Sequence, residues 1–171
     1  MNLFGEKVIL RAVETADRDL LKSLINDPEI EGQLGGKSFP VSDFTQENWI
    51  KSLAQEQNVS RYMVVSRESN ETAGTIIMND IDYVNGNAQI HIKLKPQFQG
   101  KGLGTDAIRL LVKYAFEELR LECIYAYIID YNQASLKLVE ACGFEIEGRL
   151  RKRIFKNGTF YDQYAVSILK G

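Results

Sequence analysis

Three glycines alternate with other residues at one place in the chain, Gly100, Gly102 and Gly104, and this feature constrains the fold more than any other. Residues 88–94, just before them, alternate apolar and polar side chains, which is typical of a β-strand with one buried face. Residues 105–120, just after them, carry apolar side chains at helical spacing. The segment therefore predicts a strand, a glycine-rich loop and an amphipathic helix in direct succession.

A loop of this kind is suited to binding phosphate. The first N–H groups of a helix have no partner within the helix, and the helix dipole adds to their attraction for an anion. Glycine lets the backbone adopt positive φ and approach the ligand closely. The alternative is a flexible turn that only caps the helix. Two nucleotide-binding patterns are excluded: the spacing GxxxxGK[ST] does not occur, and the sequence reads GxGxG rather than GxGxxG, with Glu122 preceding the next strand instead of ending it.

The rest of the chain predicts one α/β domain, because 171 residues without a Pro- or Ser-rich linker suit a single core. The expected order is β-α-α-β-β-β-α-β-α-β-β, a mixed, mainly antiparallel sheet of seven strands with helices on both faces. The expected strands are residues 7–12, 61–66, 73–82, 88–94, 123–129, 144–153 and 159–169. The expected helices are one capped by Thr15 and ended by Asp27-Pro28, and residues 46–57, 105–120 and 132–141. Asn85-Gly86 predicts a two-residue hairpin turn, and Asn157-Gly158 joins the last two strands.

Composition excludes several classes of protein. The net charge of −2 gives no general attraction to nucleic acid or to acidic membranes. No apolar run approaches the ~18 residues of a membrane span, so we expect a cytoplasmic enzyme or binding protein. Cys123 and Cys142 lie among apolar neighbours outside any metal-type cluster, and we expect reduced thiols and no metal site. The basic residues within 149–156 could contact an anion or simply form the solvated face of a strand.

The loop and the segments that follow it resemble one known family. Gln97-x-x-Gly100-x-Gly102 is similar to the signature with which the GNAT family of N-acetyltransferases holds the pyrophosphate of acetyl-CoA. Asn132-x-x-Ser135 followed by Gly143-Phe144 resembles the segment after the fifth strand of that family. Residues 8–11 and 147–151, with Asn157-Gly158 and Asp162, look like its branch of ribosomal-protein and spermidine acetyltransferases. The resemblance extends over essentially the whole chain.

The resemblance implies a sheet that splays apart between the fourth and fifth strands, residues 88–94 and 123–129. Pantetheine would enter there and pair with the backbone of Ile92 and Leu94, and the Ile92 N–H could polarise the thioester carbonyl. Acetyl-CoA is the implied cosubstrate, and the acceptor is a primary amine: a protein N-terminus, a polyamine or a small molecule. The cofactor-binding residues carried over in this way are Ile92, Lys93, Leu94, Gln97, Gln99, Gly100, Lys101, Gly102, Leu103, Gly104, Thr105, Asn132, Ser135 and Lys137.

The groups that move protons are less well defined. Ser135 matches the family position that protonates the departing thiolate, whereas Asn132 is either a cofactor contact or only a helix cap. Val139 occupies the position at which spermidine acetyltransferases have a tyrosine that acts as the general acid. Gln89 occupies the position at which related enzymes have a glutamate that acts as the general base. His91, on the same strand face as Gln89, could act as the base instead. A polar surface histidine and a water chain are the alternatives.

The acceptor is not specified by one sequence. Residues 28–45 would form one wall of its pocket, where Glu29, Glu31 and Asp43 either attract a cationic amine or are ordinary solvated charges. A non-catalytic acyl-CoA-binding sensor or scaffold is the alternative function, favoured by the missing glutamate. An RNA-binding protein is a third reading, which the net charge opposes. The oligomeric state is left open, a homodimer included.

Overall fold

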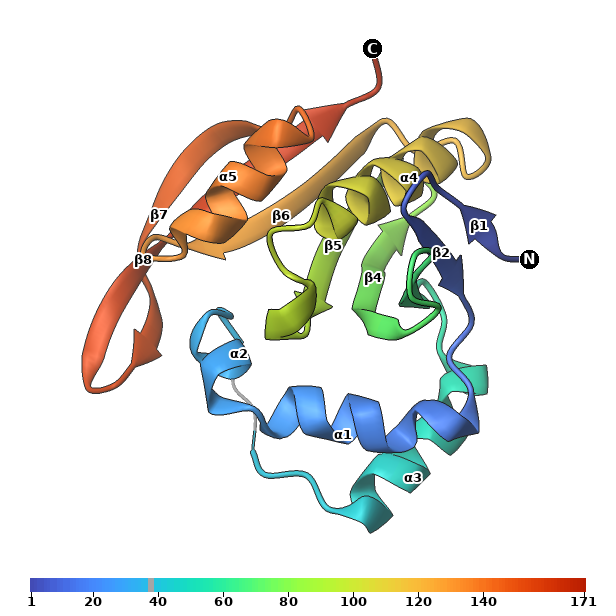
Figure 1. Ribbon diagram of the computed structural model, residues 1–171. Coiled ribbons are helices and arrows are strands. Elements are labelled where there is room, and N and C mark those ends of the chain that lie inside the picture. Colours follow the sequence, from blue (N-terminus) through green and yellow to red (C-terminus); the bar gives the residue numbers. More distant parts are fainter. Residues whose placement is uncertain (37–38) are drawn as a thin grey trace.

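The fold is built on one mixed β-sheet. The computed structural model describes residues 1–36 and 39–171. Eight strands form the sheet in the order β1-β2-β3-β4-β5-β6-β8-β7, and β5 and β6 are its parallel pair (Figure 1). The mixed sheet is as expected, but it has one strand more than the expected seven. The extra strand is the two-residue β1 at the edge, which is too short to show an alternating pattern.

Most bounds lie close to those expected from the periodicity of the sequence, but the helix expected at 46–57 covers Asp43–Ser52 and is followed by a 3-10 turn. The strands are β1 (Leu3–Phe4), β2 (Val8–Arg11), β3 (Ser60–Ser66), β4 (Thr72–Asp82), β5 (Asn87–Leu94), β6 (Cys123–Ile129), β7 (Glu145–Lys156) and β8 (Thr159–Leu169). The α-helices are α1 (Arg18–Asn26), α2 (Pro28–Gly32), α3 (Asp43–Ser52), α4 (Leu103–Glu117) and α5 (Gln133–Ala141). Short 3-10 helices cover Thr15–Asp17, Leu53–Gln55 and Pro96–Phe98.

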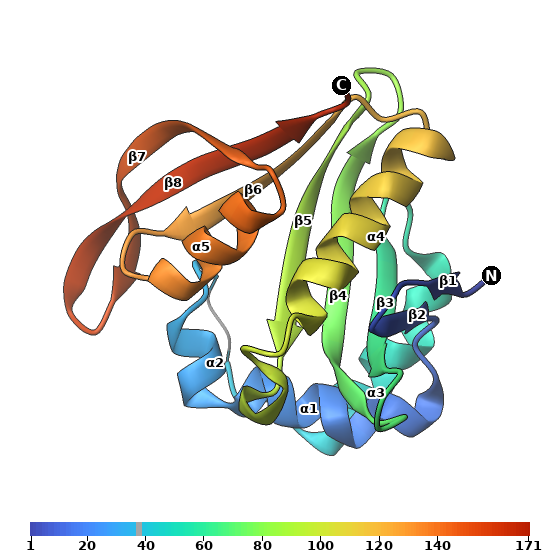
Figure 2. The same cartoon turned by 45° about the horizontal axis from the view of Figure 1, so that its top comes forward.

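Helices cover both faces of the sheet, as expected. In Figures 1 and 2, α4 and α5 lie on one side of the strands, and α1 and α3 lie on the other. Alternation along β4 places Ile76 and Met78 in the main core, where they are fully buried in the same cluster as Ile108 and Leu111 of α4. The odd-numbered residues of β4 therefore face α1 and α3.

Two expectations in the first half of the chain were wrong. Thr15 does not cap a long helix: Glu14 and Asp17 form a capping box around a 3-10 turn, and α1 begins only at Arg18. Asp27 does end α1, but its side chain then accepts hydrogen bonds from the N–H groups of Glu29 and Ile30 and starts the unexpected helix α2. Five residues are too few for helical periodicity to show. Residues 37 and 38, within the segment 28–45 expected to border the acceptor pocket, lie outside the described residues.

The two Asn-Gly pairs behave differently. Asn157 and Gly158 adopt φ of 49° and 76° between the paired residues Lys156 and Thr159, a two-residue turn. The predicted two-residue turn at residues 85–86 was wrong, because β4 and β5 are joined by the four residues 83–86. There the Asp82 carboxylate accepts hydrogen bonds from the N–H groups of Val84 and Asn85, at 2.9 and 2.8 Å, and stabilises the longer loop.

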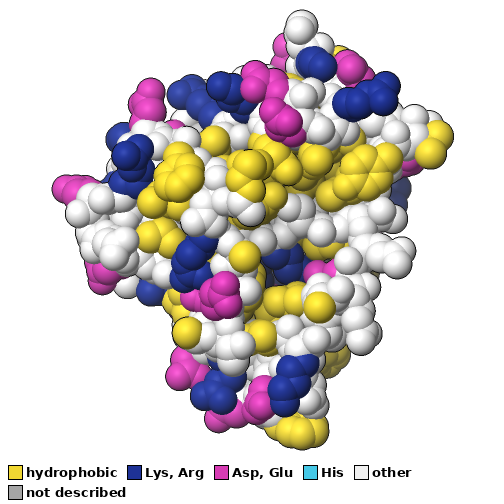
Figure 3. Space-filling model, turned by 90° about the vertical axis from the view of Figure 1, so that its right-hand side faces the viewer, with side chains coloured by type: hydrophobic (Ala, Val, Ile, Leu, Met, Phe, Trp, Pro, Cys, Tyr) yellow, Lys and Arg dark blue, Asp and Glu magenta, His cyan; other side chains and the backbone are white. Residues whose placement is uncertain are grey.

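The surface beside the first two strands is partly apolar. Figure 3 shows a band of hydrophobic side chains across this face, with charged groups on either side of it. Phe4, on the edge strand β1, is 66% exposed. Across the described ranges 1–36 and 39–171, every helix is too short or too polar to cross a membrane.

Candidate functional site

The glycine-rich segment from Gln97 to Thr105, called here the phosphate loop, has the predicted geometry. Gly100 and Gly102 adopt φ of 71° and 81°, in the left-handed region that favours glycine. Gly102 is the N-cap of α4, which begins at Leu103, so the helix starts two residues earlier than the pattern predicted. The loop therefore places the start of the longest helix directly after the end of β5.

Six successive N–H groups of this loop are available to a ligand. Within the described part of the chain, no hydrogen bond uses the backbone N–H groups of residues 100–105, and Asp106 N–H is the first to find a helical acceptor, Gly102 O at 3.1 Å. None of the described side chains caps the helix start. Free N–H groups at the positive end of a helix dipole bind phosphate, so the residues present fit a pyrophosphate group. This fit supports phosphate binding rather than a simple turn.

Contacts with the N-terminal segment around Lys7 hold the loop in place. Lys7 donates from Nζ to the carbonyl of Lys101, at 3.1 Å, and so brings a cation to the loop. The Asp106 carboxylate accepts hydrogen bonds from the N–H groups of Lys7 and Val8, at 2.7 and 3.0 Å, and ties β2 to α4. A Cβ on Gly5 would lie 2.4 Å from this carboxylate, so the contact requires glycine there. Sequence reasoning missed Lys7 and Asp106, because no local pattern marks them.

The sheet splays apart between β5 and β6. Their pairing is limited to residues 87–89 of β5 against residues 123–125 of β6, after which β6 continues against β8 alone. Lys95 donates to Ala73 O of β4, and backbone groups alternate sides along a strand, so the polar groups of Ile92 and Leu94 face the gap. An extended ligand could add there like a strand. The Gln99 side chain donates to Leu94 O, at 3.0 Å, and already occupies one acceptor of this edge.

The elements that carry the expected cofactor residues meet at Gly104. A Cβ on Gly104 would lie 3.3 Å from Leu138 of α5 and 3.4 Å from Leu94 of β5. Gly104 is buried, and its lack of a side chain allows α4 to start close to both elements. The Cys142 thiol adds a weak contact to Thr105 O, at 3.8 Å. The phosphate loop, the gap and the start of α5 thus form one continuous region.

The side chains of Asn132 and Ser135 differ in how many hydrogen bonds they make within the protein. Asn132 is buried; its Oδ1 accepts from Ser135 N–H at 3.1 Å, and its Nδ2 donates to Gln33 O at 2.9 Å. It caps α5 and ties this helix to the end of α2. The Ser135 hydroxyl is half-buried and has no hydrogen-bond partner in residues 1–36 and 39–171. Ser135 is therefore the freer of the two groups, while Lys137 is exposed on the same helix.

On the opposite face of the sheet, His91 lies in a row with two other side chains. Arg61, Ile77 and His91 are direct neighbours across β3, β4 and β5. The imidazole is exposed on one side, yet the protein around it desolvates it and lowers its pKa below the ordinary value of 6.5. Asp80 opposes this shift, whereas Lys93 and Arg61 add to it. His91 is therefore neutral at pH 7 and able to accept a proton.

Four of the charged groups expected to bind an anion or an amine have partners of their own. Arg149 contacts the carboxylates of Asp162 and Asp130, at 2.5 and 3.6 Å, and Lys156 donates to Glu31 O. Glu31 pairs with Lys93 at 3.0 Å, and Asp43 pairs with Lys22 at 2.7 Å. These contacts give Arg149 and Lys156 structural roles and leave Glu31 and Asp43 neutralised.

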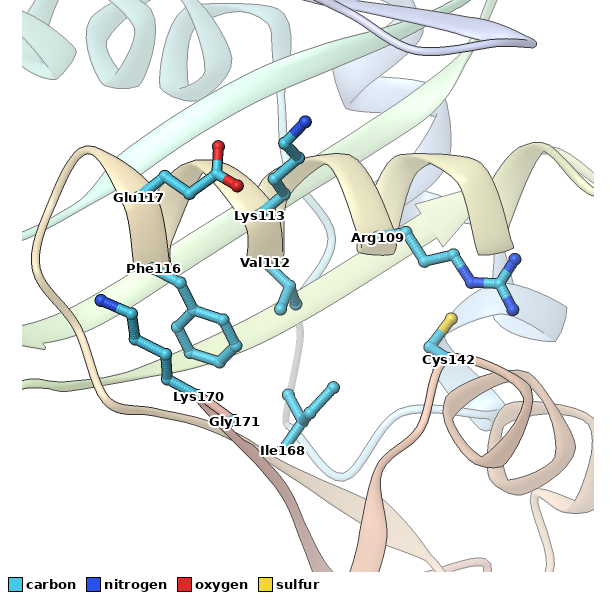
Figure 4. Close-up of a pocket in the computed structure, with 9 residues that line it drawn as sticks. All are labelled: Arg109, Val112, Lys113, Phe116, Glu117, Cys142, Ile168, Lys170 and Gly171. Carbon is cyan, nitrogen blue, oxygen red and sulfur yellow. The ribbon is translucent and has the colours of Figure 1, made fainter.

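One surface cavity lies away from the predicted site. It has a volume of about 390 Å³ between α4 and the end of β8. Figure 4 shows Val112 and Phe116 of α4 and Ile168 of β8 pointing into it, with Arg109 at one end. Arg109 already donates to Ala141 O at 2.6 Å. None of the expected cofactor residues lines this cavity, so its size alone does not make it the site.

Comparison with known proteins agrees with this geometry. Residues 7–145 match the model of an acetyltransferase (GNAT) domain. An uncharacterized N-acetyltransferase p20 of Bacillus licheniformis is 33% identical over 98% of this chain and 96% of its own. Spermidine N(1)-acetyltransferase of Vibrio cholerae is 29% identical over 97% and 95% of the two chains.

Solved structures give the same result. The crystal structure of spermidine N-acetyltransferase from Vibrio cholerae in complex with CoA and spermine superposes with a TM-score of 0.88, at 27% identity over 95% of both chains. That protein binds CoA within the same fold, and the phosphate loop and gap of this chain have the geometry such a ligand needs. The chain belongs to the GNAT family of acetyl-CoA-dependent N-acetyltransferases.

Proposed function

We propose that this N-acetyltransferase transfers the acetyl group of acetyl-CoA to a primary amine by direct attack while both substrates are bound. The phosphate loop carries the proposal, because its six free N–H groups fit the pyrophosphate. The gap beside Ile92 and Leu94 would receive pantetheine, and the Ile92 N–H would donate to the thioester carbonyl oxygen as negative charge develops there.

The reaction requires two proton transfers. The amine nitrogen forms a bond to the thioester carbon, the carbon–sulfur bond breaks, and the sulfur leaves with the electron pair. We assign His91 to accept the proton that the amine loses, because it is neutral at pH 7 and lies on the face opposite α4. We assign Ser135 to relay a proton from solvent to the sulfur, so that its hydroxyl is restored as it donates, because this hydroxyl has no other partner among the described residues. Val139 cannot serve this purpose, since its buried side chain carries no proton donor.

The proposal also covers location and metal dependence. The two cysteines are unpaired, which suits a reducing compartment, and we place the protein in the cytoplasm. The amine, the thioester and the two proton-transfer groups complete the reaction, so we propose that it proceeds without a metal ion.

Release of free thiol from acetyl-CoA tests the proposal directly. With a panel of primary amines, we expect amine-dependent thiol release, with the N-acetyl product identified by mass spectrometry. Saturating EDTA should leave the rate unchanged. Thermal stabilisation by CoA without turnover of any amine would contradict the proposal and indicate an acyl-CoA-binding sensor or scaffold.

The pH dependence tests His91. The free acceptor amine has a pKa near 10, so log kcat/KM should rise with a slope of about 1 below that pH. The pKa of His91 lies below 6.5, and protonation beneath it should add a second unit of slope. His91→Gln should restore a slope of 1 throughout and reduce kcat/KM at pH 7 by about 100-fold. A slope of 2 that persists in His91→Gln would exclude His91 as the base.

A further inference from the structure

A cavity that the mechanism does not use lies beside the row of His91, under α1 and α3. Its volume is about 290 Å³, and its lining includes Ile77, the cross-strand neighbour of His91, and Arg61, which pairs with Ile77 on the next strand. Lys93 also lines it, and Lys93 stands between Ile92 and Leu94, whose backbone faces the gap. An amine held next to His91 would therefore direct its substituent into this cavity.

The lining of the cavity is chiefly apolar. Leu21 and Leu24 of α1 and Trp49 of α3 close it on the helix side, and Ile77 forms part of its base on the sheet. A cavity of about 150 Å³ lined by such residues suffices to bind benzene. The volume here is larger, so it can hold a phenyl ring together with a short linker.

Its charged side chains are already neutralised. Arg61 makes two hydrogen bonds to Glu56, at 2.7 and 2.9 Å, and lies 5.3 Å from the centre of the Trp49 ring. Lys93 pairs with Glu31 at 3.0 Å. No carboxylate lines the cavity in the part of the chain that the structure describes. A polyamine would have to place a second ammonium group here without a partner, which is costly in an apolar site.

One polar group on the lining has no hydrogen-bond partner among the described residues. Gln46 of α3 is 4% exposed and lines the cavity, and its side-chain amide makes no hydrogen bond with the described residues. Buried amides are normally hydrogen-bonded, so this one is suited to a polar group on a ligand. Thr75, by contrast, already donates from its hydroxyl to Tyr62 O at 3.0 Å.

We infer that the acceptor is a primary amine with an apolar substituent the size of a phenylalkyl group, bearing one hydrogen-bonding group for Gln46. The inference rests on the proposed function. It differs from the spermidine that the similar proteins' names specify, because the cavity offers apolar contacts and one amide in place of free carboxylates.

Thiol release with matched amines tests the inference. We expect kcat/KM for phenethylamine to exceed that for both ethylamine and spermidine by at least about 10-fold. A loss of this size is common when a well-packed apolar group is removed from a substrate. Tyramine, which adds a hydroxyl, should be used better than phenethylamine, and Gln46→Leu should reverse that order.

Two matched variants locate the effect. Ile25→Trp fills the cavity from a half-buried lining position and should lower kcat/KM for phenethylamine about 10-fold, with less than a twofold change for ethylamine. Asn48→Trp adds the same side chain at an exposed position of α3 outside the cavity and should change neither.

The outcomes distinguish a failure of the inference about the acceptor from a failure of the proposed acetyl transfer. The inference would be overturned if spermidine were the preferred acceptor. It would also be overturned if Ile25→Trp lost activity toward ethylamine and phenethylamine to the same extent. Either outcome would leave the proposed amine acetylation intact. Binding of CoA with no thiol release from any of the four amines would instead count against the proposed function.

Discussion

Replacing Gly102 by glutamate is expected to weaken acetyl-CoA binding by about 100-fold or more, which corresponds to about 2.7 kcal/mol. The new carboxylate would stand at the N-terminus of α4, among the free N–H groups of residues 100–105. It would repel the pyrophosphate and compete for the same donors. A Cβ at this position would also lie 2.9 Å from the Lys7 Nζ, so the lysine that lies beside the loop would pair with the new group instead.

The substitution also strains the backbone, and a control must separate this effect. Gly102 has φ of 81°, and a side chain in that region costs about 1–2 kcal/mol. Gly158→Glu carries the same penalty, because Gly158 has φ of 76° and open space around it in the β7–β8 turn. Calorimetric titration with CoA should give normal affinity for Gly158→Glu and strongly reduced affinity for Gly102→Glu. Equal CoA affinities in the two variants would refute the assignment of the phosphate loop.

Ser135→Ala is expected to reduce kcat by about 100-fold near pH 7, the range found when a group that transfers a proton is removed. The hydroxyl is half-buried and has no partner among the described residues, so its loss leaves no protein group unsatisfied. The Asn132 cap should persist, because it is formed with the backbone N–H of Ser135 and not with the hydroxyl. The affinity for CoA should therefore change less than about threefold.

Three measurements distinguish proton donation from simple contact with the cosubstrate. Ser135→Thr keeps the hydroxyl and should recover most of kcat. The difference between Ser135→Ala and the parent protein should shrink above pH ~8.5, where a thiolate leaves without needing a proton. Equal losses in kcat and in CoA affinity, independent of pH, would reduce Ser135 to a binding contact.

Much of the fold could be predicted because the pattern of each long element is local. Alternating side chains located β5, and β6 has the predicted bounds, since side chains on a strand face opposite sides. Short elements could not be found in this way. β1 has two residues and α2 has five, and neither is long enough for a period to be seen. The loop after β4 depends on the Asp82 side chain, which competes successfully with the turn that Asn85-Gly86 favours.

The sequence by itself determined the phosphate loop. Positive φ at Gly100 and Gly102 and free N–H groups at a helix start are properties of neighbouring residues, so the pattern of glycines contains them. The sequence left two roles open for Asn132, a cofactor contact and a helix cap. Its hydrogen bonds to Ser135 N–H and to Gln33 O, 99 residues away, show that the side chain is engaged in capping and packing.

Only the tertiary structure decided how the charges and the acceptor side are arranged. It brought Lys7 to a loop 94 residues later, paired Glu31 with Lys93 62 residues away, and left the Gln46 amide facing an apolar cavity. It also lowered the pKa of His91 through burial and through Lys93 and Arg61. Such effects depend on distances between side chains that are remote in the sequence, and Coulomb energies and desolvation follow those distances alone. Spacing along the chain therefore predicted the proposed cosubstrate site, whereas packing across the sheet defines the proposed acceptor site.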